Sequence, residues 1–126
     1  MYIYFNPNPA GRAVGDCVIR AICKATGESW DKIFVGLAVT GLDLADMPSA
    51  NAVWGAYLQR KGYERRALPD KCPECYTVRE FARDHQTGIY ILALGGHVVT
   101  VIDGNYYDAW DSGAEMPLYV WTKKGH

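Results

Sequence analysis

The last third of the chain most constrains what this sequence can fold into, because it consists of short β-prone runs separated by turn signals. Residues before position 89 mainly carry apolar side chains at helical spacing instead. Asp103-Gly104-Asn105 is a strong hairpin signal between two of the runs. Helices followed by paired strands predict an α+β protein whose N-terminal helices pack on a C-terminal antiparallel sheet. The four predicted strands are Ile89–Leu94, His97–Ile102, Tyr106–Asp111 and Leu118–Thr122.

Helix start and stop signals divide the N-terminal two thirds of the chain. The first helix is expected from about Asp16 to Ala25, with Gly27 as its C-terminal stop. Ser29 is a suitable N-cap for a second helix, which is expected to end before a connection over residues 41–48. The remaining predicted elements are a strand over residues 2–5, a helix that starts at Ser49 or Asn51 and stops at Gly62, a strand over residues 63–68, and a helix over residues 78–85 with a capping box at Thr77 and Glu80.

Composition limits the class of protein. With 126 residues, 49% of them hydrophobic, the chain is expected to form a single domain over residues 1–126. Lys and Arg number 13 against 14 Asp and Glu, which argues against nucleic-acid binding because that needs a clustered basic excess. No run approaches the roughly 20 apolar residues of a membrane helix, and the N-terminus lacks a signal-peptide pattern. The chain is therefore predicted to be cytoplasmic, with no membrane or nucleic-acid partner.

Cys17 is the first candidate for chemistry, because it lies where the loop ending in Gly15-Asp16 gives way to the first predicted helix. A helix N-terminus lowers the pKa of a thiol, since its free N–H groups and dipole favour the thiolate. His97 opens a predicted strand 80 positions later and would supply the base that a thiol nucleophile needs. The alternatives are a buried structural cysteine and a strand-edge histidine that is bonded to a backbone carbonyl.

The register of the predicted hairpin selects the acid that orients His97. If residues 103–105 form a three-residue loop, His97 lies opposite Asp111, with Cβ atoms about 5 Å apart. A two-residue turn that begins at the glycine would pair His97 with Ser112 instead, and a bulge would restore either register. Asp111 is therefore the preferred acid and Asp108 the alternative. Asp111 would otherwise serve only to cap the turn that follows it.

These motifs resemble those of the papain-like cysteine peptidases, and most closely the small bacteriocin-leader or double-glycine peptidases. The matching pieces are Asp16-Cys17, His97-Val98-Val99 and Trp110-Asp111. The chain is also similar to uncharacterised phage and bacterial proteins with a Gly-Asp-Cys-Val-Ile-Arg-Ala start and a Gly-His-Val-Val segment. The resemblance implies a papain-like fold and thiol-dependent acyl transfer without a cofactor, most simply hydrolysis of a peptide or amide bond in a peptide or protein substrate.

The resemblance also implies a catalytic triad. Cys17 would attack the carbonyl carbon as a thiolate, His97 would hold the thiol proton and deliver it to the leaving amine, and Asp111 would orient the imidazole. Gly95 and Gly96 indicate a narrow groove beside His97, which would favour small residues near the scissile bond.

One position departs from the family pattern. The family has a glutamine six residues before the cysteine as an oxyanion-hole donor, and this chain has Gly11 there. The backbone N–H of Cys17 would supply one donor, and a loop residue the other. Asn6, Asn8 and Arg12 are the loop candidates, of which Asn8 and Arg12 rank first.

Two rival interpretations remain open. The missing glutamine favours a binding protein that keeps the fold without turnover, such as an inhibitor of a host factor encoded by a phage or mobile element. Cys72-Pro73-Glu74-Cys75 has the spacing of half a zinc site or of a redox dithiol. No second C-x-x-C exists in the chain, so Cys72 and Cys75 are expected to be plain loop cysteines and no metal is predicted.

Overall fold

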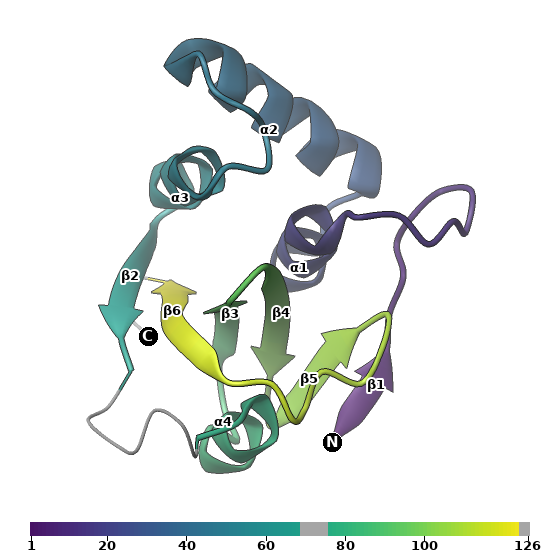
Figure 1. Ribbon diagram of the computed structural model, residues 1–126, viewed down its shortest axis with the longest axis vertical. Helices are drawn as coiled ribbons and strands as arrows, with labels where there is room; N and C mark the ends of the chain where they lie inside the picture. The colour runs from purple at the N-terminus through teal and green to yellow at the C-terminus, as the bar shows by residue number, and fades with distance from the viewer. Residues whose placement is uncertain (69–75, 124–126) are drawn as a thin grey trace.

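The computed structural model describes residues 1–68 and 76–123, in which the chain forms four helices and one six-stranded sheet (Figure 1). The predicted α+β class is therefore confirmed. No helix in these residues is both long enough and apolar enough to span a membrane. The helices are α1 (Cys17–Thr26), α2 (Trp30–Leu44), α3 (Asn51–Arg60) and α4 (Val78–Asp84). The strands are β1 (Tyr2–Tyr4), β2 (Tyr63–Ala67), β3 (Ile89–Leu94), β4 (His97–Ile102), β5 (Asn105–Asp108) and β6 (Pro117–Lys123).

The sheet is mixed, in the order β1-β5-β4-β3-β6-β2. The strands β3 to β6 pair antiparallel, as the sequence predicts. The expectation of a C-terminal antiparallel sheet is correct for β3 to β6 but incomplete, because β1 joins one edge parallel to β5 and β2 joins the other edge. Parallel pairing is possible there because most of the chain lies between β1 and β5, whereas a short hairpin would force them antiparallel.

Helices cover both faces of the sheet (Figure 1). In β3, Ile91 and Ala93 belong to the core formed with α1, α2 and α3. Their neighbours Leu92 and Leu94 belong to the core formed with α4. This division follows from the alternation of side chains along a strand, which sends odd and even positions to opposite faces. Burial on both faces makes β3 and β4 the rigid centre on which the ends of α1 and β5 are positioned.

Local signals in the sequence set most of the helix ends. Gly27 ends α1 in the left-handed region at φ 74°, as predicted. The side chain of Ser29 accepts a hydrogen bond from the amide of Lys32 and caps α2. Thr77 and Glu80 form the predicted capping box at the start of α4. These three predictions are confirmed.

The expected connection over residues 41–48 is only partly correct, because α2 continues through Gly41 to Leu44. Gly41 is buried inside the helix and accepts a hydrogen bond from the amide of Asp46 at 2.9 Å. A Cβ at position 41 would lie 2.7 Å from the carbonyl oxygen of Asp46. Gly41 therefore allows the chain to turn back closely over α2, and it does not stop the helix.

The hairpin between β4 and β5 has a register that differs from both predicted ones. Its turn is Asp103-Gly104, with φ values of 49° and 83°, as in the type I′ turns preferred by two-residue hairpins. Ile102 consequently pairs with Asn105. Continuing this register places His97 opposite Trp110, and their ring centroids lie 4.8 Å apart. Both predicted registers are wrong, because the turn uses the Asp-Gly pair.

Gly41→Ala is expected to destabilise the protein by about 1–3 kcal/mol, because the added methyl group meets a backbone oxygen that cannot rotate away. Thermal or urea unfolding followed by circular dichroism measures this change. Gly95→Ala is the control, since a Cβ there meets open space and its effect should stay within about 0.5 kcal/mol. Equal stability of the two variants would contradict the close approach at Gly41.

Candidate active site

Cys17 is the first residue of α1, as the sequence predicts. The first amide to donate along the helix is that of Arg20, which bonds the carbonyl of Asp16 at 2.8 Å. The amides of Cys17, Val18 and Ile19 therefore precede the ladder of helical hydrogen bonds. Val18 is buried in the core below, whereas Cys17 is partly exposed. The core thus anchors the start of α1 while the thiol keeps access to solvent.

His97 lies at the start of β4, next to α1, and contacts both a thiol and a carboxylate. Its Nε2 donates a hydrogen bond to Oδ2 of Asp108 at 2.6 Å. The Cys17 thiol lies near the imidazole, close enough for each group to shift the pKa of the other. Because Nε2 is engaged with Asp108, Nδ1 is the ring nitrogen that serves Cys17. The Trp110 ring packs on the imidazole, and only 13% of the His97 side chain is exposed.

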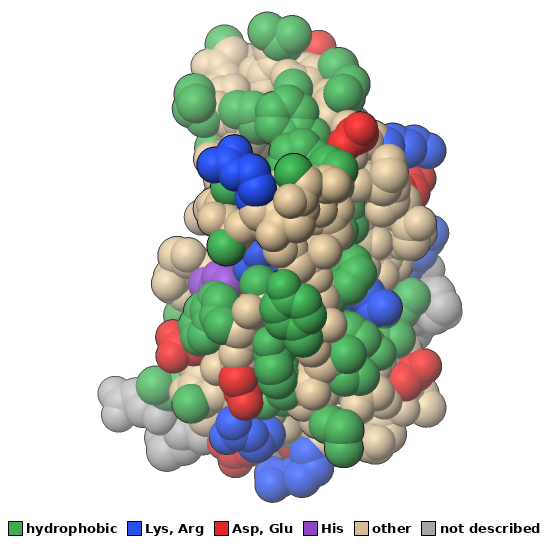
Figure 2. Space-filling model, turned by 90° about the vertical axis from the view of Figure 1, so that its right-hand side faces the viewer, with side chains coloured by type: hydrophobic (Ala, Val, Ile, Leu, Met, Phe, Trp, Pro, Cys, Tyr) green, Lys and Arg blue, Asp and Glu red, His purple; other side chains and the backbone are tan. Residues whose placement is uncertain are grey.

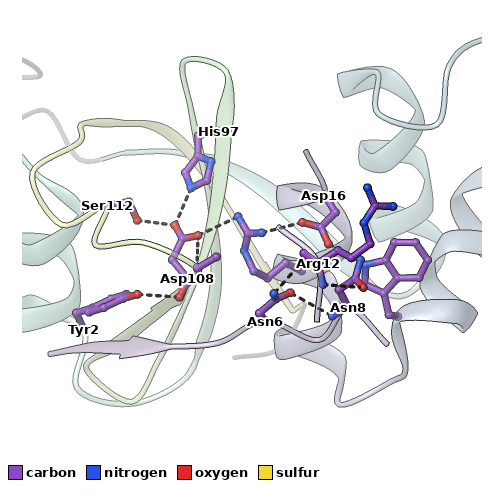
Figure 3. Close-up of polar contacts among 11 residues, drawn as sticks. Tyr2, Asn6, Asn8, Arg12, Asp16, His97, Asp108 and Ser112 are labelled. Atoms are coloured by element: carbon purple, nitrogen blue, oxygen red, sulfur yellow. Dashed lines mark hydrogen bonds and ion pairs between the residues drawn. The ribbon is translucent and has the colours of Figure 1, made fainter. Parts of the chain in front are cut away.

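Asp108 is fully buried, and each of its carboxylate oxygens has two partners (Figure 3). Oδ2 accepts from His97 and from the hydroxyl of Ser112, both at 2.6 Å. Oδ1 accepts from the Ala109 amide at 2.8 Å and from Nη2 of Arg20 at 3.0 Å. A buried carboxylate is costly to desolvate, so four partners are what allows this one to stay ionised.

The prediction of Asp111 as the orienting acid is wrong. β5 ends at Asp108, so the strand predicted to run to position 111 stops three residues earlier. The Asp111 side chain is 48% exposed, and its Oδ1 accepts from the hydroxyl of Tyr106 at 2.6 Å and from the amide of Gly113 at 3.0 Å. Asp111 therefore caps the turn that follows it. The shifted hairpin register brings the alternative acid, Asp108, to His97.

Charges favour an ion pair between Cys17 and His97. Burial raises the pKa of the Cys17 thiol, but the hydrogen bond and charge of His97, the Val98 amide and Arg20 together lower it below its usual value. Burial lowers the pKa of His97, but the contacts with Asp108 and Cys17 outweigh this and raise it to about 9. Burial raises the pKa of Asp108, and the hydrogen bonds from His97 and Ser112 reverse the shift, so that it lies below the usual value.

Cys23 provides a contrast within the same helix. Only 2% of its surface is exposed, and burial together with the charges of Asp16 and Glu28 raises its pKa to about 11. A thiolate is therefore disfavoured at Cys23 and favoured at Cys17, which lie six positions apart on α1.

A cavity of about 480 Å³ opens beside Cys17 and His97. It lies between the start of α1, the helices α2 and α3, and the turn that joins β3 to β4. Most of its wall is apolar, and Gly15 and Gly96 contribute backbone to it. The larger apolar side chains of the wall are Ile19, Phe34, Leu37, Trp54 and Leu94.

The loop candidates for the oxyanion hole form a network of their own (Figure 3). Oδ1 of Asn8 accepts from the amides of Ala10 and Arg12. Nδ2 of Asn6 donates to the carbonyl of Arg12 at 3.2 Å. None of these side chains lines the cavity, so the role of Asn8 or Arg12 stays a prediction.

Sequence reasoning missed two residues of this site. Arg20 had a signal, since Asp16 and Arg20 have the i, i+4 spacing of a helical ion pair and Arg20 lies beside the apolar stripe of α1. Ser112 had none, because its contact with Asp108 depends on how the chain turns after β5.

The described residues contain no group of three His, Cys, Asp or Glu side chains that would hold a metal ion. Cys72 and Cys75 lie outside the described residues. The prediction that they are plain loop cysteines therefore stays a prediction.

Comparison with known proteins leaves the family open. No protein-family model, no curated protein and no solved structure matches the chain. The resemblance to papain-like peptidases thus stays a prediction, and the case for a function depends on the geometry of Cys17, His97 and Asp108.

Iodoacetamide is expected to alkylate Cys17 much faster than Cys23 near neutral pH, because the thiolate is the reactive form and the thiol pKa is lowered at Cys17 but raised at Cys23. The Cys17 rate should reach its plateau at a lower pH than the rate of an ordinary thiol. Peptide mass mapping after timed labelling measures both rates. His97→Ala should slow the labelling of Cys17 and leave Cys23 unchanged. Equal, slow labelling of the two thiols would contradict the ion pair.

Asp108→Asn is expected to slow alkylation of Cys17 at neutral pH by on the order of tenfold, because His97 loses the charge that stabilises its protonated form. Asp111→Asn is the matched control and should leave the rate unchanged, since Asp111 bonds Tyr106 and the Gly113 amide and His97 bonds Asp108 instead. Circular dichroism confirms that each variant is folded. A larger effect of Asp111→Asn than of Asp108→Asn would restore Asp111 as the orienting acid.

Proposed function

We propose that this chain is a papain-like cysteine peptidase, which hydrolyses peptide or amide bonds through a thioester on Cys17. The observation that carries the proposal is the series of contacts from the Cys17 thiol through His97 to the buried Asp108. This series combines a nucleophile, a proton carrier and an orienting carboxylate. A thiol at a helix start beside a strand that begins with the histidine also supports a papain-like relationship.

The proposed reaction has two halves. The Cys17 thiolate attacks the carbonyl carbon of the scissile bond, and protonated His97 delivers the proton from Nδ1 to the leaving amine as the carbon–nitrogen bond breaks. Water then attacks the thioester, His97 accepts a proton from it, and the carbon–sulfur bond breaks to release the acid and restore the thiolate. Asp108 holds the ring orientation through Nε2 in both halves.

The start of α1 supplies a donor for the oxyanion. The amide of Cys17 precedes the helical hydrogen-bond ladder, so it is free to bind the negative oxygen that forms during attack. One such donor is typically worth about 2.7–4 kcal/mol of transition-state stabilisation. A second donor from the loop over residues 6–12 would raise the rate further, and Asn8 and Arg12 remain the candidates.

The cavity beside Cys17 supports a substrate with a bulky apolar side chain near the scissile bond. Its wall is mainly apolar, and its volume of about 480 Å³ is within the usual range of ligand pockets. Gly95 and Gly96 still favour small substrate residues where the backbone crosses the turn between β3 and β4. The two preferences apply to different positions of one extended peptide.

Peptidyl electrophiles with Leu or Phe at one of the three positions before the reactive group are expected to label Cys17 about 10–200-fold faster than those with Gly there. The physical reason is burial of the side chain in the cavity. Labelling rates, followed by mass spectrometry, identify the position concerned. An Asp at that position should slow the reaction, and Cys17→Ala should abolish it. Equal rates for Leu, Gly and Asp at every position would contradict the role of the cavity.

Turnover is tested with a mixture of defined peptides. The wild-type protein should cleave peptides that carry the preferred side chain, and Cys17→Ala should cleave none. The rate should rise with pH as Cys17 ionises and fall above about pH 9, where His97 loses the proton that it gives to the leaving amine. Binding of peptides without any cleavage, by a protein whose Cys17 reacts readily, would overturn the peptidase proposal.

The second candidate is a binding protein without turnover, which is encoded by a phage or mobile element and inhibits a host factor. Two observations favour it: the family glutamine is replaced by Gly11, and α2 exposes an apolar surface. Figure 2 shows hydrophobic side chains gathered over the end of the molecule formed by α2. Val35, Val39 and Leu42 are exposed there.

A further inference from the structure

Arg20 joins two buried carboxylates, one on each side of the site. It lies three residues after Cys17 on α1, and only 5% of its surface is exposed. Its Nη1 lies 2.8 Å from Oδ1 of Asp16, and its Nη2 lies 3.0 Å from Oδ1 of Asp108. Figure 3 shows Asp16 and Asp108, the two carboxylates that these contacts join.

Asp16, the member of this ion-pair network at the start of α1, is itself held in place by a second contact. Oδ2 of Asp16 accepts a hydrogen bond from the indole N–H of Trp30 at 2.9 Å, so the carboxylate is held from α2 as well as from α1. A planar guanidinium that binds two anchored carboxylates has little freedom to move. Arg20 therefore ties the position of Asp108, on β5, to the helix that carries Cys17.

Arg20 also sets the charge around Cys17. The titratable groups close to the network include Asp16 at the N-cap of α1, Asp108 from β5, His97 from β4, Cys23 from α1 and the hydroxyl of Tyr2 from β1. Without Arg20, two buried carboxylates would face a single imidazolium, and a third negative charge on Cys17 would be harder to form. With Arg20 present, the two carboxylates are largely balanced.

We propose that Arg20 is a positioning residue of the active site, which holds Asp108 behind His97 and supplies the positive charge that favours the Cys17 thiolate. The proposal rests on the proposed function in one respect, because it takes Cys17 as the nucleophile. Arg20 does not touch the reacting atoms, so it acts in two indirect ways: it holds Asp108 behind His97, and its charge acts on Cys17 from a distance.

The test measures the pKa of the Cys17 thiol from the pH dependence of iodoacetamide alkylation in wild type, Arg20→Lys and Arg20→Met. The thiol pKa should be lowest in wild type and highest in Arg20→Met. It should be intermediate in Arg20→Lys, which keeps the positive charge but cannot bind both carboxylates as the planar guanidinium does. Neutral-pH alkylation of Arg20→Met should be slower by on the order of tenfold, which corresponds to one pKa unit. Arg60→Met is the matched control, because Arg60 forms an exposed ion pair with Asp43, and it should leave the pKa unchanged.

Asp16→Asn provides a second test, which depends on the direction in which the thiol pKa shifts. Removing this negative charge should lower the thiol pKa, whereas removing Arg20 should raise it. A purely structural role predicts loss of stability in both variants without opposite shifts. If Arg20→Met does not fold, Arg20→Lys and Asp16→Asn carry the comparison. Folded Arg20 variants with the wild-type thiol pKa would overturn the proposal.

The same experiment separates this inference from the peptidase proposal. A thiol pKa that depends on Arg20, in a protein that cleaves no peptide, would support the positioning role and contradict the peptidase. If the protein cleaves peptides but its thiol pKa is unchanged in the Arg20 variants, the positioning role is contradicted and the peptidase proposal is not.

Discussion

The ionised, fully buried carboxylate of Asp108 is the interaction on which the rest of the site depends. It is kept charged by an imidazole, a hydroxyl, a guanidinium and a backbone amide, which come from three different parts of the chain. Its own backbone carbonyl accepts from the amide of Phe5 and the hydroxyl of Tyr2, so β1 is held to the same residue. Loss of this charge would leave several buried donors unmatched at once.

The parts of the site that local signals encode were predictable. Cys17 follows a loop and starts an amphipathic helix that ends at a glycine, so its place at a helix N-terminus could be predicted from neighbouring residues alone. His97 opens a run of apolar and β-branched residues, so its place at a strand start could be predicted in the same way. Both residues lie where the sequence indicates, and the structure brings them together.

The identity of the acid that contacts His97 could not be predicted, because a shift of one residue in the turn between β4 and β5 changes which acid faces the imidazole. Asp103-Gly104-Asn105 supports several loops, and each register turns a different residue toward His97. The two-residue turn on Asp103-Gly104 is settled by the two positive φ angles together with the packing of β5 against β1. The extension of α2 past Gly41 could not be predicted for a similar reason. A glycine is needed at this position because the chain returns over α2 and brings the carbonyl of Asp46 close to it, which local sequence does not indicate.

Two contacts connect segments that lie 79 or more positions apart in the sequence. One is the pairing of β1 with β5, and the other is the hydrogen bond from the Thr100 hydroxyl to the carbonyl of Ala21. Contacts of such long sequence separation close only when nearly the whole polypeptide is available. A nascent chain that has exposed α1 but not yet β4 and β5 therefore carries an ordinary, unassisted cysteine. Assistance from His97 and Asp108 therefore becomes available to the sulfur only once synthesis has passed Asp108.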